Sequence, residues 1–309
     1  MTFANAALRK GILAAAGSPR LQRFVSAHGM RFGARRFVGG ATLDEVVETL
    51  RALNAQGLAA NTTLLGEDVR NTAAAAAIAG RYEEILQRLA DERLDANVAL
   101  KLTQLGLAAD PEAAYRNVAR LVRHAAGVGN FVRIDMEESR HVEPTLDVYR
   151  RLRAGGQSNV GVVLQSYLYR SEADLASLLP LEPNVRLVKG AYLEAASVAY
   201  PQKRDVDAAF VRLAERALAE GGYTAIATHD ERLIDHVIEF CRRKAISGGR
   251  FEFQMLYGVR PRLQLDLVRR GHRVRVATPY GSEWYPYLMR RLAERPANVL
   301  FFVRSLVQR

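Results

Sequence analysis

The chain has 309 residues, of which 49% are hydrophobic and 25% charged, a composition typical of a globular protein with a large core. Its one cysteine, Cys241, excludes an internal disulfide and any cysteine-rich metal site. The formal net charge of +11 favours an anionic partner, such as a nucleic acid, an anionic membrane surface or a phosphate-bearing cofactor.

Residues 1–57 are predicted to form helices that pack on the rest of the protein. Basic side chains and no acid precede Asp44, which is also typical of a transit peptide, but the apolar residues recur at helical spacing. A helix over 43–53 begins after Thr42, a favourable N-cap, and ends before Gly57. No apolar run approaches the roughly 20 residues of a membrane span, so any membrane contact is predicted to be peripheral.

From residue 58 onward, short apolar strands alternate with amphipathic helices. The predicted strands are 58–65, 97–102, 131–136, 160–165, 185–189, 224–228, 251–256 and 273–277. Among the predicted helices, the first ends at about Ala90, the second begins at the Asp110-Pro111 cap and the fourth begins at Ser171. The others cover 144–153, 205–220, 230–244 and 282–294. Eight strand-then-helix units in about 250 residues predict a (β/α)8 TIM-like barrel over 58–309, with an apolar C-terminal helix near 299–303. An open, doubly wound sheet is the alternative.

Polar side chains stand at the carboxyl ends of nearly all these strands, where barrel enzymes place their active sites. They are Glu67, Lys101, Asp135, Gln165, Lys189 with Tyr192, His229, Gln254 and Tyr280. Because the carboxyl ends of parallel strands converge on one face, these residues predict a pocket there. The six histidines are scattered and match no metal-binding pattern, so no metal is expected.

The segment 185–194 carries two cations, Arg186 and Lys189, at the end of an apolar strand. Buried cations need an anion or a polar ligand to meet them, and Gly190 lets a ligand approach the backbone. The pair Arg290-Arg291, flanked by aromatic residues, adds to a site built for anions.

Two other functions stay open on the residues alone. A Schiff-base lyase or aldolase would use Lys101 or Lys189 as its nucleophile. A basic nucleic-acid-binding protein would suit the charge, but the chain has no helix-turn-helix, zinc finger or aromatic RNA-binding motif. Nucleic acid is therefore not predicted as a partner.

Four motifs in order resemble the proline dehydrogenase family, in particular its short monofunctional bacterial members. They are Arg-Leu-Val-Lys-Gly-Ala-Tyr at 186–192, Ala-Thr-His-Asp at 227–230, Phe-Glu-Phe-Gln-Met-Leu-Tyr-Gly-Val at 251–259 and Tyr-Leu-Met-Arg-Arg-Leu-Ala-Glu at 287–294. The resemblance runs from about residue 58 to the end. It implies a distorted (β/α)8 barrel with non-covalent FAD that oxidises L-proline to Δ1-pyrroline-5-carboxylate, in the catabolism of proline towards glutamate.

The resemblance also implies roles for individual residues. Arg290, Arg291 and Lys101 would bind the proline carboxylate, Glu67 would pair with Arg290 as a gate, and the pocket around the ring would be lined by Asp135, Tyr192 and Leu256. Arg186 and Gln165 would contact the flavin ring, and close approach of the cofactor would be permitted by Val188, Gly190 and Ala191. The pyrophosphate, ribose or adenine part would meet Thr228, His229 and Glu294.

The partners follow from the same resemblance. Electrons would pass to a membrane quinone, and a separate pyrroline-5-carboxylate dehydrogenase would be a transient partner that takes the product. The expected location is cytoplasmic, with a peripheral contact on the inner face of the membrane. In one departure, Ala277 stands where the family usually has a Tyr two residues before the proline at the end of strand eight. Unless Tyr280 fills that space, a roomier pocket would accept 4-hydroxyproline.

Overall fold

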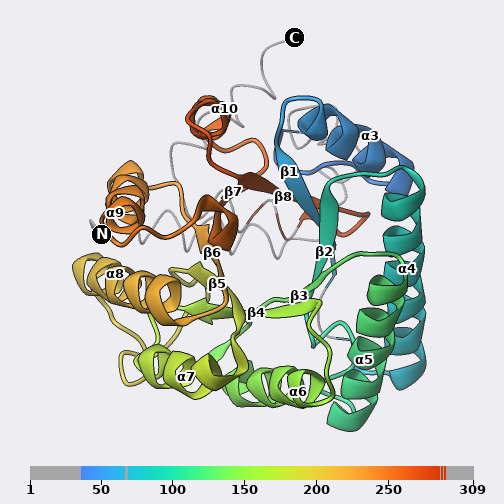
Figure 1. Cartoon of the computed structure of the whole chain (residues 1–309). Coiled ribbons are helices and arrows are strands. Elements are labelled where there is room, and N and C mark those ends of the chain that lie inside the picture. The colour runs from blue at the N-terminus through green and yellow to red at the C-terminus, as the bar shows by residue number, and fades with distance from the viewer. Residues whose placement is uncertain (1–35, 67–68, 286, 288, 290–309) are drawn as a thin grey trace.

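A computed structural model describes residues 36–66, 69–285, 287 and 289. Eight parallel strands close into a barrel in which each strand pairs with the next and the eighth pairs with the first. They are β1 (Ala59–Leu64), β2 (Ala96–Leu100), β3 (Val132–Ile134), β4 (Val160–Gln165), β5 (Asn184–Val188), β6 (Tyr223–Ala227), β7 (Phe251–Leu256) and β8 (Val274–Tyr280). The closed barrel is confirmed, and the open sheet is excluded (Figure 1).

Helices surround the barrel and connect successive strands (Figure 1). Their bounds are α3 (Leu43–Asn54), α4 (Thr72–Asp91), α5 (Pro111–Gly127), α6 (Val142–Ala154), α7 (Ser171–Leu178), α8 (Lys203–Glu220), α9 (Glu231–Arg243) and α10 (Pro261–Arg269). Shorter 3-10 turns cover Ser139–His141, Leu179–Leu181 and Gly248–Arg250. The helix expected over 282–294 is represented in the described residues by Trp284, Tyr285, Tyr287 and Met289, all helical.

Helix starts follow the predicted caps. The Thr42 hydroxyl accepts a hydrogen bond from the Glu45 amide at 3.3 Å, and Glu45 accepts in return from the Thr42 amide. Asp110 caps α5 by accepting from the amides of Glu112 and Ala113, with Pro111 in the first turn. These local contacts satisfy backbone donors that the helix itself leaves unpaired.

Some elements differ from the expected ones. The structure ends β3 at Ile134, and β8 continues past Ala277 because its pairing with β1 runs as far as Leu64 opposite Tyr280. The helix α10 was not predicted, although Pro261 at its first turn is a favourable start. Arg260, in the left-handed conformation, turns the chain into this helix without a side-chain cap.

The side chains of each strand divide between the barrel interior and the layer under the helices. One set joins the continuous apolar core with the helices, as Val132 and Ile134 of β3 do. Since side chains alternate along a strand, Arg133 and Asp135 face the interior. The interior is unusually polar for this fold, in which branched aliphatic side chains normally fill the barrel. Its buried members include Asn61, Arg133, Gln165, Arg186, Glu252, Gln254 and Arg275.

A short segment before α3 spans the barrel's closing edge. Phe37 and Val38 are buried, the Gly39 amide donates to the carbonyl of Pro279 at 2.8 Å, and the Gly281 amide donates to that of Gly40 at 3.1 Å. The helix α3 packs on β1 and β8. The division of the chain at 57/58 stays a prediction, since residues 1–35 lie outside the described part.

Candidate active site at the carboxyl ends of the strands

The closed parallel barrel brings the carboxyl ends of all its strands to one rim. Lys101, Asp135 and Lys189 directly follow β2, β3 and β5, and Gln165 and Leu256 are the last residues of β4 and β7. The neighbouring β5–α8 and β6–α9 connections carry Gly190, Ala191, Tyr192, Thr228 and His229. Residues far apart in the sequence therefore share this rim. Gln254 and Tyr280 do not belong to it.

Arg186 and Asp135 form an ion pair in the barrel interior. Nη1 of Arg186 donates to Oδ1 of Asp135 at 2.6 Å, and the Arg186 side chain is only 10% exposed. The need of Arg186 for an anion is therefore met by the protein itself. Its other two nitrogens, Nε and Nη2, are buried and have no hydrogen-bond partner among the described residues. A buried donor without an acceptor is costly, so these two N–H groups favour a bound acceptor.

A flavin fits this donor set. The pyrimidine side of the isoalloxazine ring offers nitrogen and carbonyl acceptors, which suit the two unpartnered donors of Arg186. Gly190 has a φ of +114°, and a Cβ there would lie 2.2 Å from the Tyr167 ring. Only glycine is compatible with this backbone at the rim.

Gln165 and Glu137 order the strand ends beside Asp135. The Gln165 amide nitrogen donates to the Glu137 carbonyl oxygen at 2.9 Å. The buried Glu137 carboxylate accepts from the Thr103 amide at 3.1 Å and from its hydroxyl at 2.6 Å. Burial raises the pKa of Glu137 above its ordinary value, although the bonds from Thr103 oppose the shift. Sequence reasoning missed Glu137, whose signal was its two-residue spacing from Asp135.

Lys189 lies between two carboxylates. Its Nζ is 2.5 Å from Oδ1 of Asp207 on α8 and 3.4 Å from Oδ2 of Asp230, the N-cap of α9. Lys203 contacts the same two carboxylates. Burial by itself would raise the pKa of Asp207, but the hydrogen bonds from Lys189 and Lys203 lower it below its ordinary value. Lys189 is therefore the ion-pair partner of two carboxylates that lie at the starts of α8 and α9.

His229 is fixed by the strand ends around it. Its Nε2 accepts a hydrogen bond from the Leu256 amide at 2.9 Å, so the other ring nitrogen carries the proton when the ring is neutral. The guanidinium of Arg260 donates to the His229 carbonyl oxygen at 2.8 Å. His229 and Leu256 are thereby held at adjacent strand ends.

Ala277 faces the interior, and Tyr280 does not fill the space beside it. Ala277 lies opposite Leu256 of β7 and Asn61 of β1. Tyr280 belongs to the apolar core under the helices, where it is only 3% exposed. Burial raises its pKa to about 12, and the charges of Arg81 and Glu84 on α4 also act on its phenol. The expectation that Tyr280 lines the carboxyl rim is therefore wrong, because the strand alternation turns it outward.

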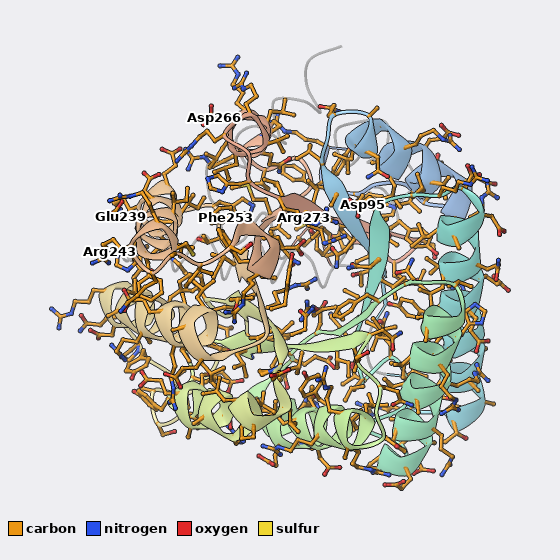
Figure 2. The ribbon with its side chains drawn as sticks, in the orientation of Figure 1. Asp95, Glu239, Arg243, Phe253, Asp266 and Arg273 are labelled. Carbon is orange, nitrogen blue, oxygen red and sulfur yellow. The ribbon has the colours of Figure 1, made fainter. Side chains whose placement is uncertain are left out.

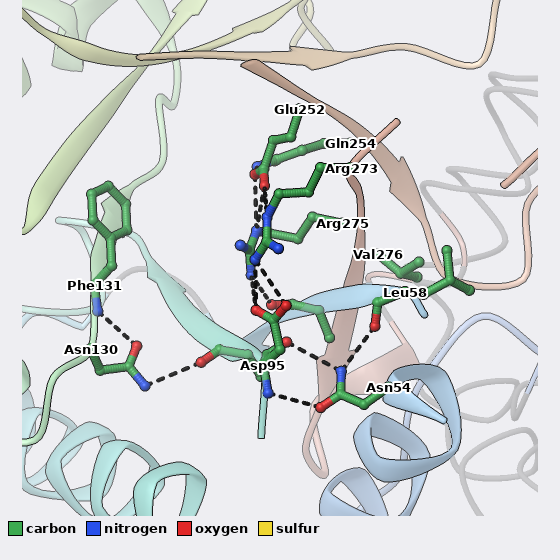
Figure 3. A network of polar contacts seen from close by, with 12 residues as sticks. Asn54, Leu58, Asp95, Asn130, Phe131, Glu252, Gln254, Arg273, Arg275 and Val276 are labelled. Carbon is green, nitrogen blue, oxygen red and sulfur yellow. Dashed lines mark hydrogen bonds and ion pairs between the residues drawn. The ribbon is translucent and has the colours of Figure 1, made fainter. Parts of the chain in front are cut away.

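Gln254 points to the opposite end of the barrel. Its amide nitrogen donates to Oε1 of Glu252 at 2.5 Å, within a network near the amino ends of the strands (Figure 3). Gln254 therefore belongs to that network, and the expectation that it lies at the carboxyl rim is wrong. Four other expected residues, Glu67, Arg290, Arg291 and Glu294, lie outside the described part of the chain.

Comparisons with known proteins agree with the barrel. A sequence model of the family described as "Proline dehydrogenase" matches residues 46–304. "Proline dehydrogenase 1" of Bacillus subtilis (strain 168) is 40% identical over 302 residues, which cover 98% of this chain and 100% of that protein. "Proline dehydrogenase" of Deinococcus radiodurans is 41% identical over 304 residues, covering 97% of this chain and 98% of that one.

A solved structure shares the fold. It is the crystal structure of proline utilization A from Bdellovibrio bacteriovorus inactivated by N-propargylglycine. It superposes with a TM-score of 0.79 at 25% sequence identity and covers 84% of this chain. The present chain spans 32% of that longer chain.

Proposed function

The chain belongs to the proline dehydrogenase family, and from this we propose that it oxidises L-proline to Δ1-pyrroline-5-carboxylate with non-covalent FAD at the carboxyl rim of the barrel. The Arg186–Asp135 pair is the observation that carries the proposal of a flavin. Two buried donors of this pair, which have no partner within the described ranges, lie among the strand ends that carry the family motifs.

Arg186 and Gln165 would contact the isoalloxazine ring, and Val188, Gly190 and Ala191 would let it approach the end of β5. Thr228, His229 and Glu294 would meet the rest of the cofactor. FAD, when bound, supplies the hydride acceptor. The protein fixes the orientation of the ring through the rigid strand ends, and orientation of this kind contributes strongly to rate.

The substrate would lie over the same rim. Lys101, Arg290 and Arg291 would bind the carboxylate, and Asp135, Tyr192 and Leu256 would surround the ring, with Glu67 pairing to Arg290 as a gate. Cations near the amine would favour its neutral form, which is the form that loses a hydride from C5.

A membrane quinone as electron acceptor and a separate pyrroline-5-carboxylate dehydrogenase as transient partner belong to the same proposal. So do a cytoplasmic location and a peripheral contact with the inner face of the membrane. Among the described residues, no helix is both long and apolar enough to span a bilayer.

The Schiff-base alternative is not favoured. The family assignment supports an oxidoreductase, and two carboxylates surround the ammonium of Lys189. Incubation with a carbonyl substrate and borohydride is therefore expected to leave both Lys189 and Lys101 unmodified.

The decisive experiment is an absorption spectrum. The purified protein should carry the yellow flavin spectrum and should bleach anaerobically when L-proline is added. N-propargylglycine should inactivate it, and L-proline should protect it by competing for the same rim. A colourless protein that gains no activity with added FAD would contradict the proposal.

Ala277→Tyr is expected to narrow the substrate range. A phenol beside Leu256 would occupy the space on the side where a ring hydroxyl projects, since Tyr280 is turned into the outer core. We expect the kcat/KM ratio of proline to 4-hydroxyproline to rise about tenfold, the effect of about 1.4 kcal/mol of steric conflict. Ala277→Ser, which adds little volume, is the control. Equal ratios in the Tyr variant and the unmodified protein would disprove a roomier pocket.

Arg291→Met is expected to raise KM for proline about tenfold to a hundredfold, because a charge-assisted hydrogen bond to the carboxylate contributes about 1.5–3 kcal/mol. Flavin content should stay the same, as measured by the absorbance ratio of flavin to protein. Arg291→Lys should fall between the two. An unchanged KM in the Met variant would remove Arg291 from the substrate site.

A further inference from the structure

Arg133 is a second buried arginine in the barrel interior, and no part of the proposed reaction uses it. It lies two residues before Asp135 on β3, on the same face of the strand, and is only 3% exposed. Its guanidinium crosses β4 over Gly161, where a Cβ would come within 2.3 Å of its Nη1. The absence of a side chain at Gly161 therefore makes room for Arg133.

The contacts of Arg133 are all with neutral groups. Nη1 donates to the carbonyl oxygens of Asn184 at 2.8 Å and Val162 at 3.2 Å, and Nη2 donates to Oδ1 of Asn184 at 2.5 Å. Its Cζ lies 4.9 Å from the centre of the Phe131 ring. Within the described residues, no carboxylate lies close enough to form an ion pair with it, and Nε has no partner.

Two parallel links therefore join β3 to β5 across β4. Asp135 binds Arg186 in the link nearer the rim, and Arg133 binds Asn184 in the link below it. Asn184 and Arg186 are two residues apart on β5, as Arg133 of β3 and Asp135 just after that strand are, so both links face the interior. The upper link joins opposite charges, whereas the lower link holds a cation that forms no ion pair with any residue the structure describes.

The positive charges of Arg133 and Arg186 repel each other. Burial, followed by the positive charge of Arg186, lowers the pKa of Arg133 to about 9, although the charges of Glu252 and Asp135 oppose the shift, so the guanidinium is still charged at neutral pH. A buried charge without an ion-pair partner destabilises the fold, and in a poorly hydrated interior its field is weakly screened. An apolar side chain at this position would avoid that cost, so a buried arginine next to the candidate site indicates a functional role.

We propose that Arg133 is a positioning residue that maintains a positive potential beneath Arg186 and thereby favours reduction of the bound cofactor. The inference rests on the proposed function, because it needs a flavin at the rim. Reduction by hydride adds negative charge to that site, and a fixed cation below it stabilises the added charge. Arg133 does this through the interior, without touching substrate or cofactor, by its link to Asn184 and its repulsion of Arg186.

The test is the midpoint potential of the bound flavin, measured in the holoprotein against a dye of known potential. Arg133→Met and Arg133→Gln both remove the charge, and Gln retains a donor for Asn184. Each should lower the midpoint potential of the flavin by about 30 mV, which corresponds to a tenfold smaller equilibrium constant for reduction of a two-electron couple. Arg133→Lys keeps a charge and should remain close to the unmodified protein.

A charge-neutral control separates this effect from general disturbance of the interior. The double variant Glu252→Gln/Arg275→Met removes a buried ion pair near the amino ends of the strands without changing the net charge. Its potential should equal that of the unmodified protein, whereas a shift matching the Arg133 variants would overturn the proposal.

The remaining outcomes are also decisive. Unmodified potentials in both the Met and Gln variants would overturn the inference while leaving the proposed function intact. Failure of both to fold, with a folded Lys variant, would assign Arg133 a structural role and likewise overturn it. An unmodified protein that binds no FAD would instead contradict the proposed function itself.

Discussion

Arg186→Met is expected to lower kcat/KM for proline by about a hundredfold to a thousandfold, the usual effect of removing one well-placed donor from a buried site. The variant loses the two donors that have no hydrogen-bond partner in the described part of the chain, and it leaves the Asp135 carboxylate without its cation. Flavin content should also fall. Steady-state kinetics with added FAD, together with the absorbance ratio of flavin to protein, measure the two effects separately.

A double variant distinguishes lost chemistry from lost stability. Arg186→Met/Asp135→Asn removes both charges of the pair, so no unpaired carboxylate remains in the interior. It should melt at a higher temperature than Arg186→Met alone and should remain as inactive. Activity within tenfold of the unmodified protein in either variant would remove Arg186 from the site.

Arg275→Met is expected to lower the free energy of unfolding by about 3–5 kcal/mol, because the buried Glu252 carboxylate loses the cation that contacts both of its oxygens. Nε of Arg275 donates to both oxygens of Glu252, at 2.9 Å and 3.1 Å, and its Nη1 donates to the Ala60 carbonyl oxygen at 2.7 Å. Arg273 reaches the same carboxylate at 3.3 Å and binds Asp95 at 2.7 Å (Figure 3). Chemical denaturation provides the measurement.

Because of its position, this network is expected to affect the stability of the fold and not the candidate site. Asp95 and Arg273 directly precede β2 and β8, so they lie at the amino ends of the strands, opposite the candidate site. In Figure 2 these two residues lie near each other at the barrel, whereas Glu239 and Arg243 project from α9 at the periphery. Glu239→Gln is therefore a suitable surface control and should change the free energy of unfolding by less than about 0.5 kcal/mol.

The same network predicts a dependence on pH. Burial by itself would raise the pKa of Glu252, but the charge and hydrogen bond of Arg275 lower it below its ordinary value. A depressed carboxyl pKa stabilises the folded state above the unfolded pKa, and this contribution disappears as the pH falls through the folded value. Glu252→Gln should therefore reduce the acid-induced loss of stability.

Local chemistry made most elements of the fold predictable. The caps at Thr42 and Asp110 satisfy helix ends with neighbouring residues, so their signal lies within a few positions of sequence. Strand boundaries that depend on pairing with residues far away in the sequence were harder to predict. The extension of β8 to Tyr280 depends on pairing with β1, more than 200 residues earlier in the chain, as the Leu64–Tyr280 register shows.

The candidate site likewise has features that could be predicted from the sequence and features that could not. Strand alternation and barrel closure sufficed to predict that Lys101, Asp135 and Gln165 share a rim. The counter-charges of the two cations in the 185–194 segment could not be predicted. Asp135 is 51 residues from Arg186, and Asp230 is 41 residues from Lys189, so only the folded barrel brings them together.

The segment that crosses the closing edge limits how the protein can be shortened. Although the strand-and-helix alternation begins at Ala59, Phe37 and Val38 are buried and Gly39 is bonded to the end of β8. The Gly258 turn after β7 packs so closely on the Arg36 carbonyl that a Cβ would lie 1.6 Å from it. A truncated protein that starts at residue 58 would therefore expose apolar surface where the first and last strands meet. Shortened or fused forms of the protein should therefore retain residues 36–42.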